Sequence, residues 1–141
     1  SNKDIILVKQ FRLPTMGMNN EDGWLLEIVA GISENKEDEF QTIEREMKEE
    51  IGFKPEKLIK IADVHMAPGS VKEFLSIFYA EVSNDTQVSK GGGVDVGEDI
   101  KIIRYKYEDL INLLIEGKIT DAKTFIALQW LSINKDYIQK N

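Results

Sequence analysis

The sequence predicts an α/β fold, a sandwich in which helices cover a mixed β-sheet. Short runs rich in Ile, Val, Leu and Phe recur along the chain, as strands require. One segment carries apolar residues at helical spacing, and two more helical segments close the chain. Strands, a helix, further strands and then helices, in that order, are typical of a packed α/β domain.

The first elements have clear local signals. Residues 4–11 (DIILVKQF) and 24–31 (WLLEIVAG) are short and apolar, so both are expected to be strands, the second ending at Gly31. The loop between them, residues 14–23, contains Pro, Gly and Asn-Asn. A helix is then expected over residues 37–51 and should stop at Gly52. Its apolar stripe should face the core and consists of Phe40, Ile43, Met47 and Ile51.

The rest of the chain continues this order. Residues 57–67, 73–82 and 100–105 are expected to be strands, and residues 83–99 a long polar loop with a triple glycine. A loop of that length in a small domain is more often functional than idle. Helices are expected over 107–118 and 121–138, with Asp121 as the N-cap of the second.

Composition limits the possible functions. The 141 residues fit a single domain, residues 1–141. The chain has no cysteine, which excludes disulfides and cysteine nucleophiles and suits a reducing cytoplasm. A net charge of −7 argues against binding to nucleic acid or an anionic membrane, and no apolar run is long enough to span a bilayer. A phosphate-bearing substrate fits this charge if metal ions bridge the two negative partners.

The segment from Gly31 to Phe53 contains eight Asp or Glu residues. Glu46 and Glu50 are four residues apart and stack on one helix face, with Glu49 at its border. Such carboxylates repel one another unless a hard cation such as Mg²⁺, which prefers oxygen ligands, lies against them. The alternative is a solvated acidic face.

Two further features of this segment are local. Arg45 and Glu37 lie two helical turns apart and could form an ion pair that clamps the preceding loop. Gly31 and Gly52 would permit backbone shapes at the two ends that other residues resist.

These residues resemble the Nudix box in full: Gly31, five residues, Glu37, seven residues, Arg45-Glu46-Met47, one residue, Glu49-Glu50, one residue, Gly52. The resemblance implies hydrolysis of a nucleoside diphosphate linked to another group, with Mg²⁺ or Mn²⁺ as cofactor. It implies metal ligation by Glu46, Glu50 and the Ala30 carbonyl. Glu49 would ligate metal or help to activate water.

The resemblance extends over roughly residues 4 to 133. The segments WLLEIVAG, MAPGS and EGKITDAKTFIALQWL look like the ADP-ribose pyrophosphatase branch, and GGGVDVGEDI is similar to the GDP-mannose hydrolases. Both groups cleave nucleoside diphosphate sugars, so this substrate class is expected, with a nucleoside monophosphate and a sugar phosphate as products. Relatives of this kind have an upstream segment, which we expect to be absent here, and a homodimer is expected.

The resemblance also implies substrate contacts. Arg12 matches a substrate-binding arginine whose planar fork suits phosphate. Pro68 matches a distinctive proline, next to Gly69, while Glu73 would touch ribose or metal and Lys123 phosphate or sugar. For Arg12, Glu73 and Lys123 the alternative is an ordinary surface side chain.

The general base is open among Asp95, Glu98 and Glu49. Counting back from EDI places Glu98 on a metal-ligand position, whereas the position two residues earlier, a glutamate in relatives, is Val96. Asp95 could replace that glutamate if the loop shifts by one residue.

The alternative functions are hydrolysis of another nucleotide substrate and a Nudix-fold module that senses a nucleotide sugar without cleaving it.

Overall fold

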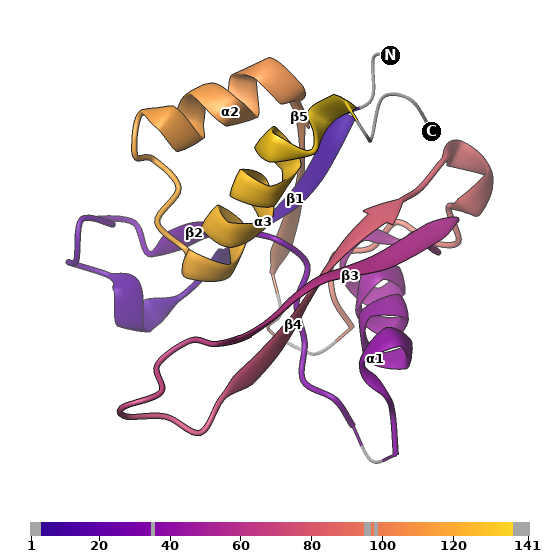
Figure 1. Cartoon of the computed structure of the whole chain (residues 1–141), viewed down its shortest axis with the longest axis horizontal. Coiled ribbons are helices and arrows are strands. Elements are labelled where there is room, and N and C mark those ends of the chain that lie inside the picture. The colour runs from indigo at the N-terminus through magenta and orange to yellow at the C-terminus, as the bar shows by residue number, and fades with distance from the viewer. Residues whose placement is uncertain (1–3, 35, 95–96, 98, 137–141) are drawn as a thin grey trace.

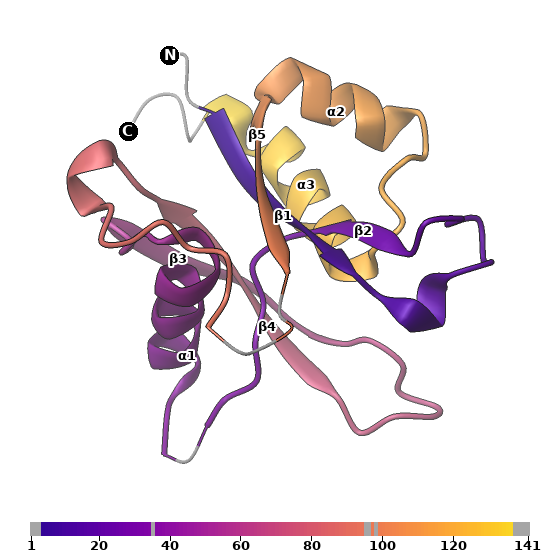
Figure 2. The same ribbon diagram turned by 180° about the vertical axis from the view of Figure 1, so that it is seen from behind.

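The computed structural model describes residues 4–34, 36–94, 97 and 99–136. In chain order, the elements are β1 (Asp4–Phe11), a 3₁₀ turn η1 (Leu13–Thr15), β2 (Trp24–Glu27), α1 (Glu39–Glu46), a π-helical turn η2 (Met47–Ile51), β3 (Lys57–His65), β4 (Phe74–Glu81), a 3₁₀ turn η3 (Asn84–Thr86), β5 (Ile100–Lys106), α2 (Tyr107–Ile115) and α3 (Ala122–Ile133). Figure 1 shows α2 and α3 together on one side of the strands and α1 on the other, and Figure 2 shows the same arrangement from behind.

Strand β1 is the centre of the fold because its two faces belong to two different cores. Alternate residues of a strand point to opposite faces. Leu7 therefore packs with α2 and α3, in a cluster whose other buried members are Leu110, Leu114, Ile119 and Leu128. Val8 packs on the opposite side with Met47 and Ile51 of η2, together with Phe53 and Ile100. These two cores confirm the predicted α/β class, with helices on both sides of the strands.

The strand pairings differ from the predicted mixed sheet. In the described residues, β1 pairs antiparallel with β2 and β5, and β3 pairs antiparallel with β4. Residues 12–23 join β1 to β2 and residues 66–73 join β3 to β4, neither with an α-helix, whereas parallel neighbours need a crossover connection that is usually an α-helix. The strands that pair here are therefore antiparallel.

Strand β2 ends at Glu27, four residues earlier than predicted. The reason lies in the hydrogen bonds of the next segment. The Ile28 N–H donates to the Thr124 hydroxyl at 2.8 Å, and the Ala30 N–H donates to the Glu50 carboxylate at 3.4 Å. Because residues 28–30 bond to α3 and η2, they leave the sheet and run between the two helical layers.

The predicted helix over 37–51 is present in two parts. Asp38 caps its start by accepting from the Gln41 N–H at 2.9 Å, so α1 begins at Glu39. The last turn is π-helical and ends, as predicted, at Gly52, whose N–H donates to the Met47 carbonyl at 2.9 Å with a φ of 80°. Phe40 departs from the predicted buried stripe. It lies in the first turn of α1, is 42% exposed, and packs edge-on against Phe78.

Asp121 is the N-cap of α3, as predicted, and accepts from the Thr124 N–H at 3.1 Å. Helix α3 ends at Ile133, with a turn at Asn134, but residues 135 and 136 are again helical, and the last two residues of the predicted helix lie outside the described ranges. No helix in the described ranges has both the length and the apolar character needed to cross a bilayer.

Candidate active site

Arg45 lies at the centre of an ion-pair cluster on the acidic helix. Its Nε and Nη2 donate to the two carboxylate oxygens of Glu37 at 2.9 and 3.2 Å, which confirms the predicted pair. Its Nη1 lies 2.8 Å from Glu46 Oε1 and 3.2 Å from Glu49 Oε2, and its Nη2 also donates to the Ile32 carbonyl at 3.1 Å. The hydrogen bond with Glu37 raises the pKa of Arg45 and lowers the pKa of Glu37. Arg45 thus places one positive charge among three carboxylates and fixes the loop before the helix.

The segment Ala30–Gly31 lies directly against the carboxylates of this helix. The Ala30 N–H bonds to Glu50, which is 4% exposed. A Cβ on Gly31 would lie only 1.8 Å from Glu46 Oε1, so only a glycine allows this approach. The structure therefore brings together four predicted positions from two segments: Ala30, Gly31, Glu46 and Glu50.

The oxygen atoms gathered here suit a hard divalent cation, since carboxylates and a backbone carbonyl are the ligands that Mg²⁺ accepts. Glu46 and Glu49 are both turned toward Arg45. Within the described part of the chain, no three acidic or histidine side chains already form a cluster that could hold a metal ion. The predicted ligand Glu98 and the candidate base Asp95 lie outside the described residues.

The loop between β4 and β5, which carries Asp95 and Glu98, is hydrogen-bonded to the end of the same helix. The Gly92 N–H donates to the Glu50 carbonyl at 2.8 Å, and the Gly93 N–H donates to the Glu49 carbonyl at 3.0 Å. These bonds satisfy carbonyls at the helix end that would otherwise lack partners. The triple glycine therefore attaches the loop beside the two glutamates, a role that the sequence did not reveal.

A second charged cluster surrounds Glu27, a residue that sequence reasoning missed. Glu27 is 3% exposed and accepts from Arg12 Nε at 2.8 Å and from Lys123 Nζ at 2.6 Å. Lys123 also donates to both carboxylate oxygens of Asp121 at 3.0 Å. The signal available in the sequence was an acidic residue within the apolar run WLLEIVAG.

Arg12 connects the two clusters electrostatically. Its hydrogen bond with Glu27 raises the pKa of Arg12, and the negative charges of Glu27, Glu50 and Asp121 act in the same direction. Arg12 therefore lies close enough to Glu50 to sense its charge. Arg12 is thus an ion-paired side chain that is 42% exposed, and its role in substrate binding stays a prediction.

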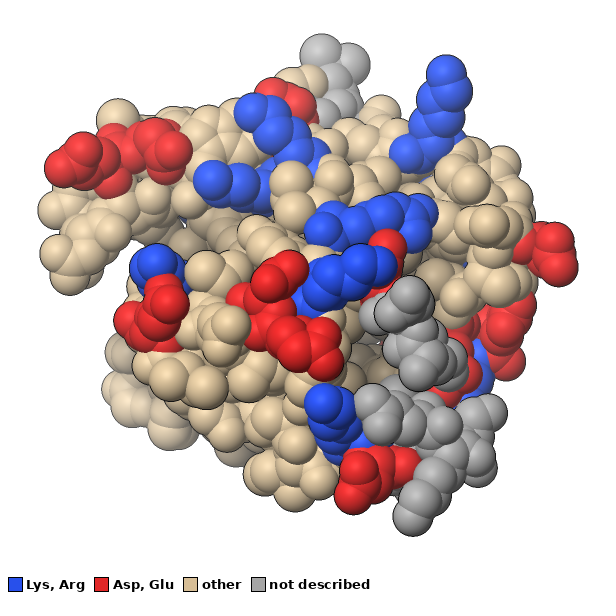
Figure 3. Space-filling model, turned by 90° about the horizontal axis from the view of Figure 1, so that it is seen from above, with Lys and Arg blue, Asp and Glu red and all other residues tan. Residues whose placement is uncertain are grey.

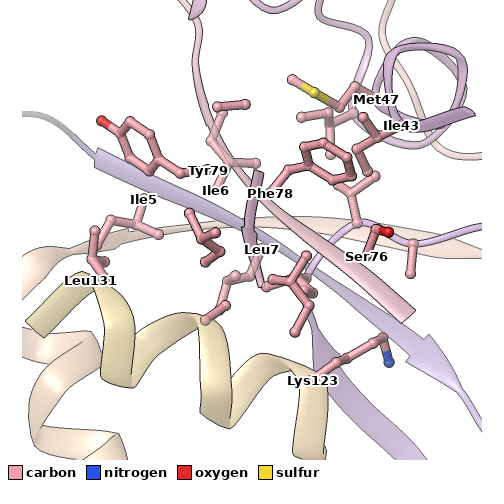
Figure 4. A pocket seen from close by; sticks show the side chains of 18 of the residues that line it. Ile5, Ile6, Leu7, Ile43, Met47, Ser76, Phe78, Tyr79, Lys123 and Leu131 are labelled. Atoms are coloured by element: carbon pink, nitrogen blue, oxygen red, sulfur yellow. The ribbon is translucent and has the colours of Figure 1, made fainter. Parts of the chain in front are cut away.

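A cavity of about 1190 Å³ separates β1 from β4 and extends to α1 and α3. Figure 4 shows Ile5 and Leu7 of β1, Phe78 and Tyr79 of β4, and Lys123 of α3 around it. Ala30, Gly31, Glu73 and Lys123 all line this cavity. Pro68 and Gly69 instead line a separate pocket of about 370 Å³ in the loop between β3 and β4. The structure thus brings Glu73 and Lys123 to one cavity but leaves Pro68 and Gly69 apart from it.

The molecular surface carries both signs of charge. Figure 3 shows Lys and Arg side chains lying among Asp and Glu side chains on the face seen from above. This mixture accompanies the formal net charge of −7.

This α/β fold presents an acidic helix with a glycine at each end, and the arginine of the helix is paired with a glutamate upstream of it. These features define a hydrolase of the Nudix class. The family model described as NUDIX domain matches residues 1–129, so the chain belongs to this family, as predicted.

Relatives give a finer comparison. A GDP-mannose pyrophosphatase of Salmonella arizonae is 36% identical over 134 residues, covering 95% of this chain and 69% of the relative. The GDP-mannose pyrophosphatase of Escherichia coli O157:H7 is 34% identical over 132 residues, which cover 94% of this chain and 68% of that relative. A crystal structure of an ADP compounds hydrolase superimposes with a TM-score of 0.74 at 21% identity, covering 94% of this chain and 68% of that one. This last likeness supports the fold.

Proposed function

We propose that this chain hydrolyses the pyrophosphate bond of a nucleoside diphosphate sugar in a reaction that depends on Mg²⁺ or Mn²⁺. The products would be a nucleoside monophosphate and a sugar phosphate. The observation that carries the proposal is the contact of Ala30–Gly31 with Glu46 and Glu50 on a helix whose arginine is clamped to Glu37. The GDP-mannose pyrophosphatases at 34–36% identity support the substrate class.

The donor set fits a divalent cation. The Ala30 carbonyl and the carboxylates of Glu46, Glu49 and Glu50, with Glu98 from the attached loop, would hold it. Nudix hydrolases generally use divalent metals, and such an ion offsets phosphate charge and acidifies bound water when present. The role of this chain's own residues is to present oxygen atoms from a rigid element, so that little reorganisation is needed during the reaction.

Arg12 and Lys123 would bind the anionic substrate: both are cations paired with Glu27, the charge of Glu50 acts on Arg12, and Lys123 lines the large cavity. Glu73, at the cavity wall, would contact ribose or metal, and Pro68 and Gly69 would contact substrate from the loop between β3 and β4. The proton of the attacking water would pass to Glu49, Glu98 or Asp95. Glu49 suits this role because its side chain is 29% exposed and lies beside the attached loop.

GDP-mannose is the substrate that the curated relatives favour. A panel of GDP-mannose, ADP-ribose, ADP-glucose and UDP-glucose, each incubated with Mg²⁺ and separated by chromatography, tests this. We expect the fastest cleavage with GDP-mannose and no cleavage after treatment with EDTA, with Mg²⁺ or Mn²⁺ restoring it. Binding of one compound without cleavage of any would favour the sensor alternative. A homodimer and a cytoplasmic location stay predictions.

A further inference from the structure

We propose that Glu27 is a positioning residue that holds Arg12 and Lys123 together so that they can grip the anionic part of the substrate. This inference rests on the proposed function, which assigns both cations to substrate binding. Glu27 itself would contact no substrate. Its carboxylate would instead fix the place and direction of two cations that come from distant parts of the sequence.

Both carboxylate oxygens of Glu27 are used. Oε2 accepts from Arg12 Nε at 2.8 Å, and Oε1 accepts from Arg12 Nη2 at 3.3 Å and from Lys123 Nζ at 2.6 Å. The Glu27 side chain is only 4% exposed. A buried carboxylate is unfavourable unless it is paired and hydrogen-bonded, and Glu27 meets that requirement with two cations at once.

The position of Glu27 in the fold explains why it can join these groups. It is the last residue of β2 and lies opposite Val8 of β1, three residues before Ala30. Directly after it, the Ile28 N–H bonds to Thr124, whose hydroxyl donates to Asp121 at 2.6 Å. The end of β2 is therefore tied to the first turn of α3, where Lys123 lies.

The charges of this cluster balance. Arg12 and Lys123 offset Glu27 and Asp121, so the four side chains sum to zero formal charge. A neutral, hydrogen-bonded cluster can be rigid, and the pairing offsets part of the desolvation cost of its buried charges. An arriving pyrophosphate would meet two cations that are already oriented, so less ordering is required on binding.

The two cations remain accessible to different degrees. The Arg12 side chain is 42% exposed, and its bonds to Glu27 use Nε and Nη2, which leaves the Nη1 side of the guanidinium for an anionic ligand. Lys123 is 15% exposed and lines the large cavity. Figure 4 shows it at the edge of this cavity, on the first turn of α3. The two cations are thus anchored to Glu27 on their buried side, and their outer side faces the proposed substrate.

The test is a double-mutant cycle on KM. Glu27→Gln keeps the shape but removes the charge that orients both cations, and we expect KM for the cleaved nucleotide sugar to rise about 10-fold, with kcat within about 3-fold. Arg12→Ala should raise KM as well, and the double variant should raise KM by less than the product of the two single effects, because without Arg12 the carboxylate of Glu27 positions only Lys123. Effects that multiply in the double variant would show a general structural role and overturn the proposal. The matched control is Asp63→Asn, which should leave KM unchanged. It removes a β3 carboxylate that pairs with Lys60 of the same strand and accepts a hydrogen bond from Ser76 of β4.

Two additions separate the possible failures. Circular dichroism shows whether Glu27→Gln folds. If it does not, Glu27→Asp takes its place, because it keeps the charge but moves the carboxylate away from the two cations. A KM for Glu27→Asp equal to that of the wild type would then overturn the proposal. The second addition is calorimetric binding of inorganic pyrophosphate with Mg²⁺. Weaker binding to Glu27→Gln supports positioning even if the wild type cleaves no substrate, in which case only the proposed function fails. Equal binding to both proteins, or binding to neither, overturns the positioning role.

Discussion

Arg45 and Glu37 form a two-point pair, with Nε to Oε1 at 2.9 Å and Nη2 to Oε2 at 3.2 Å, across eight positions of sequence. The pair joins the loop before α1 to the last turn of that helix. Since the same guanidinium also contacts Glu46 and Glu49, the pair sets where those carboxylates lie. The clamp on the loop and the arrangement of the acidic face therefore depend on one side chain.

Arg45→Lys is expected to lower kcat about 10-fold or more, because an ammonium group cannot replace the planar, two-point contact and its additional bonds. Steady-state kinetics with the cleaved substrate would measure this. Lys48→Arg is a suitable control, since Lys48 pairs with Glu44 on the same helix without contacting the Arg45 cluster. A wild-type kcat for Arg45→Lys would show that the point charge alone is sufficient.

The Arg45–Glu37 pair should also give stability a pH dependence. Its hydrogen bond lowers the pKa of Glu37 below the ordinary value of 4.5. The folded state therefore holds the Glu37 proton less tightly than the unfolded state, and the pair stabilises the protein above that ordinary pKa. This stabilisation is lost as pH falls through the lower folded pKa. Urea unfolding free energies of wild type and Glu37→Gln should differ near neutral pH and converge as the pH falls well below the ordinary Glu37 pKa. A difference that grows with acid would contradict this.

Glu50→Gln should abolish turnover, by about 10³-fold or more, and leave the fold intact. The amide keeps an oxygen that can accept from the Ala30 N–H but loses the negative charge that a divalent cation needs. Kinetics would be measured beside thermal unfolding, and Mg²⁺ should raise the unfolding midpoint of the wild type more than that of the variant. Retention of the wild-type rate would remove this helix from the mechanism.

Gly31→Ala should reduce activity about 10-fold to 100-fold, because its Cβ would overlap Glu46 Oε1 and displace that carboxylate. Ile32→Ala is the neighbouring control: Ile32 is 87% exposed, and only its backbone carbonyl contacts Arg45. The comparison uses kcat/KM at saturating and limiting Mg²⁺. We expect the defect of Gly31→Ala to be larger at limiting Mg²⁺, and equal defects would argue against a displaced ligand.

The general base can be identified with Glu49→Gln, Glu98→Gln and Asp95→Asn. Replacing the base should lower kcat about 10²-fold or more and remove the acidic limb of the pH–rate profile. The other two variants should keep that limb. If all three variants retain it, the proton goes to a different group.

Much of the local structure was predictable because its causes are local. Gly52 ends the helix and Asp121 caps α3, since both effects depend on residues within one turn. The Arg45–Glu37 pair was predictable from its eight-residue spacing, although Glu37 lies in the loop just before α1. The bounds of β1 and the existence of the other strands also followed from short apolar runs.

The predictions were wrong where the local structure depends on partners from distant parts of the chain. Strand β2 is shorter than its apolar run because Thr124 and Glu50 take the backbone donors of Ile28 and Ala30. Phe40 fits the helical stripe but lies at the open end of the helix, where burial is incomplete. The antiparallel pairings depend on which strands become neighbours, and composition does not encode that choice.

The sequence by itself determined the family, the acidic helix and the glycines at its ends, because these residues lie at fixed spacing within about twenty positions of one another. Only the tertiary structure decided that Glu27 joins Arg12 and Lys123, which lie 15 and 96 positions away. A buried carboxylate takes whichever cations the fold brings to it, and no local pattern specifies them.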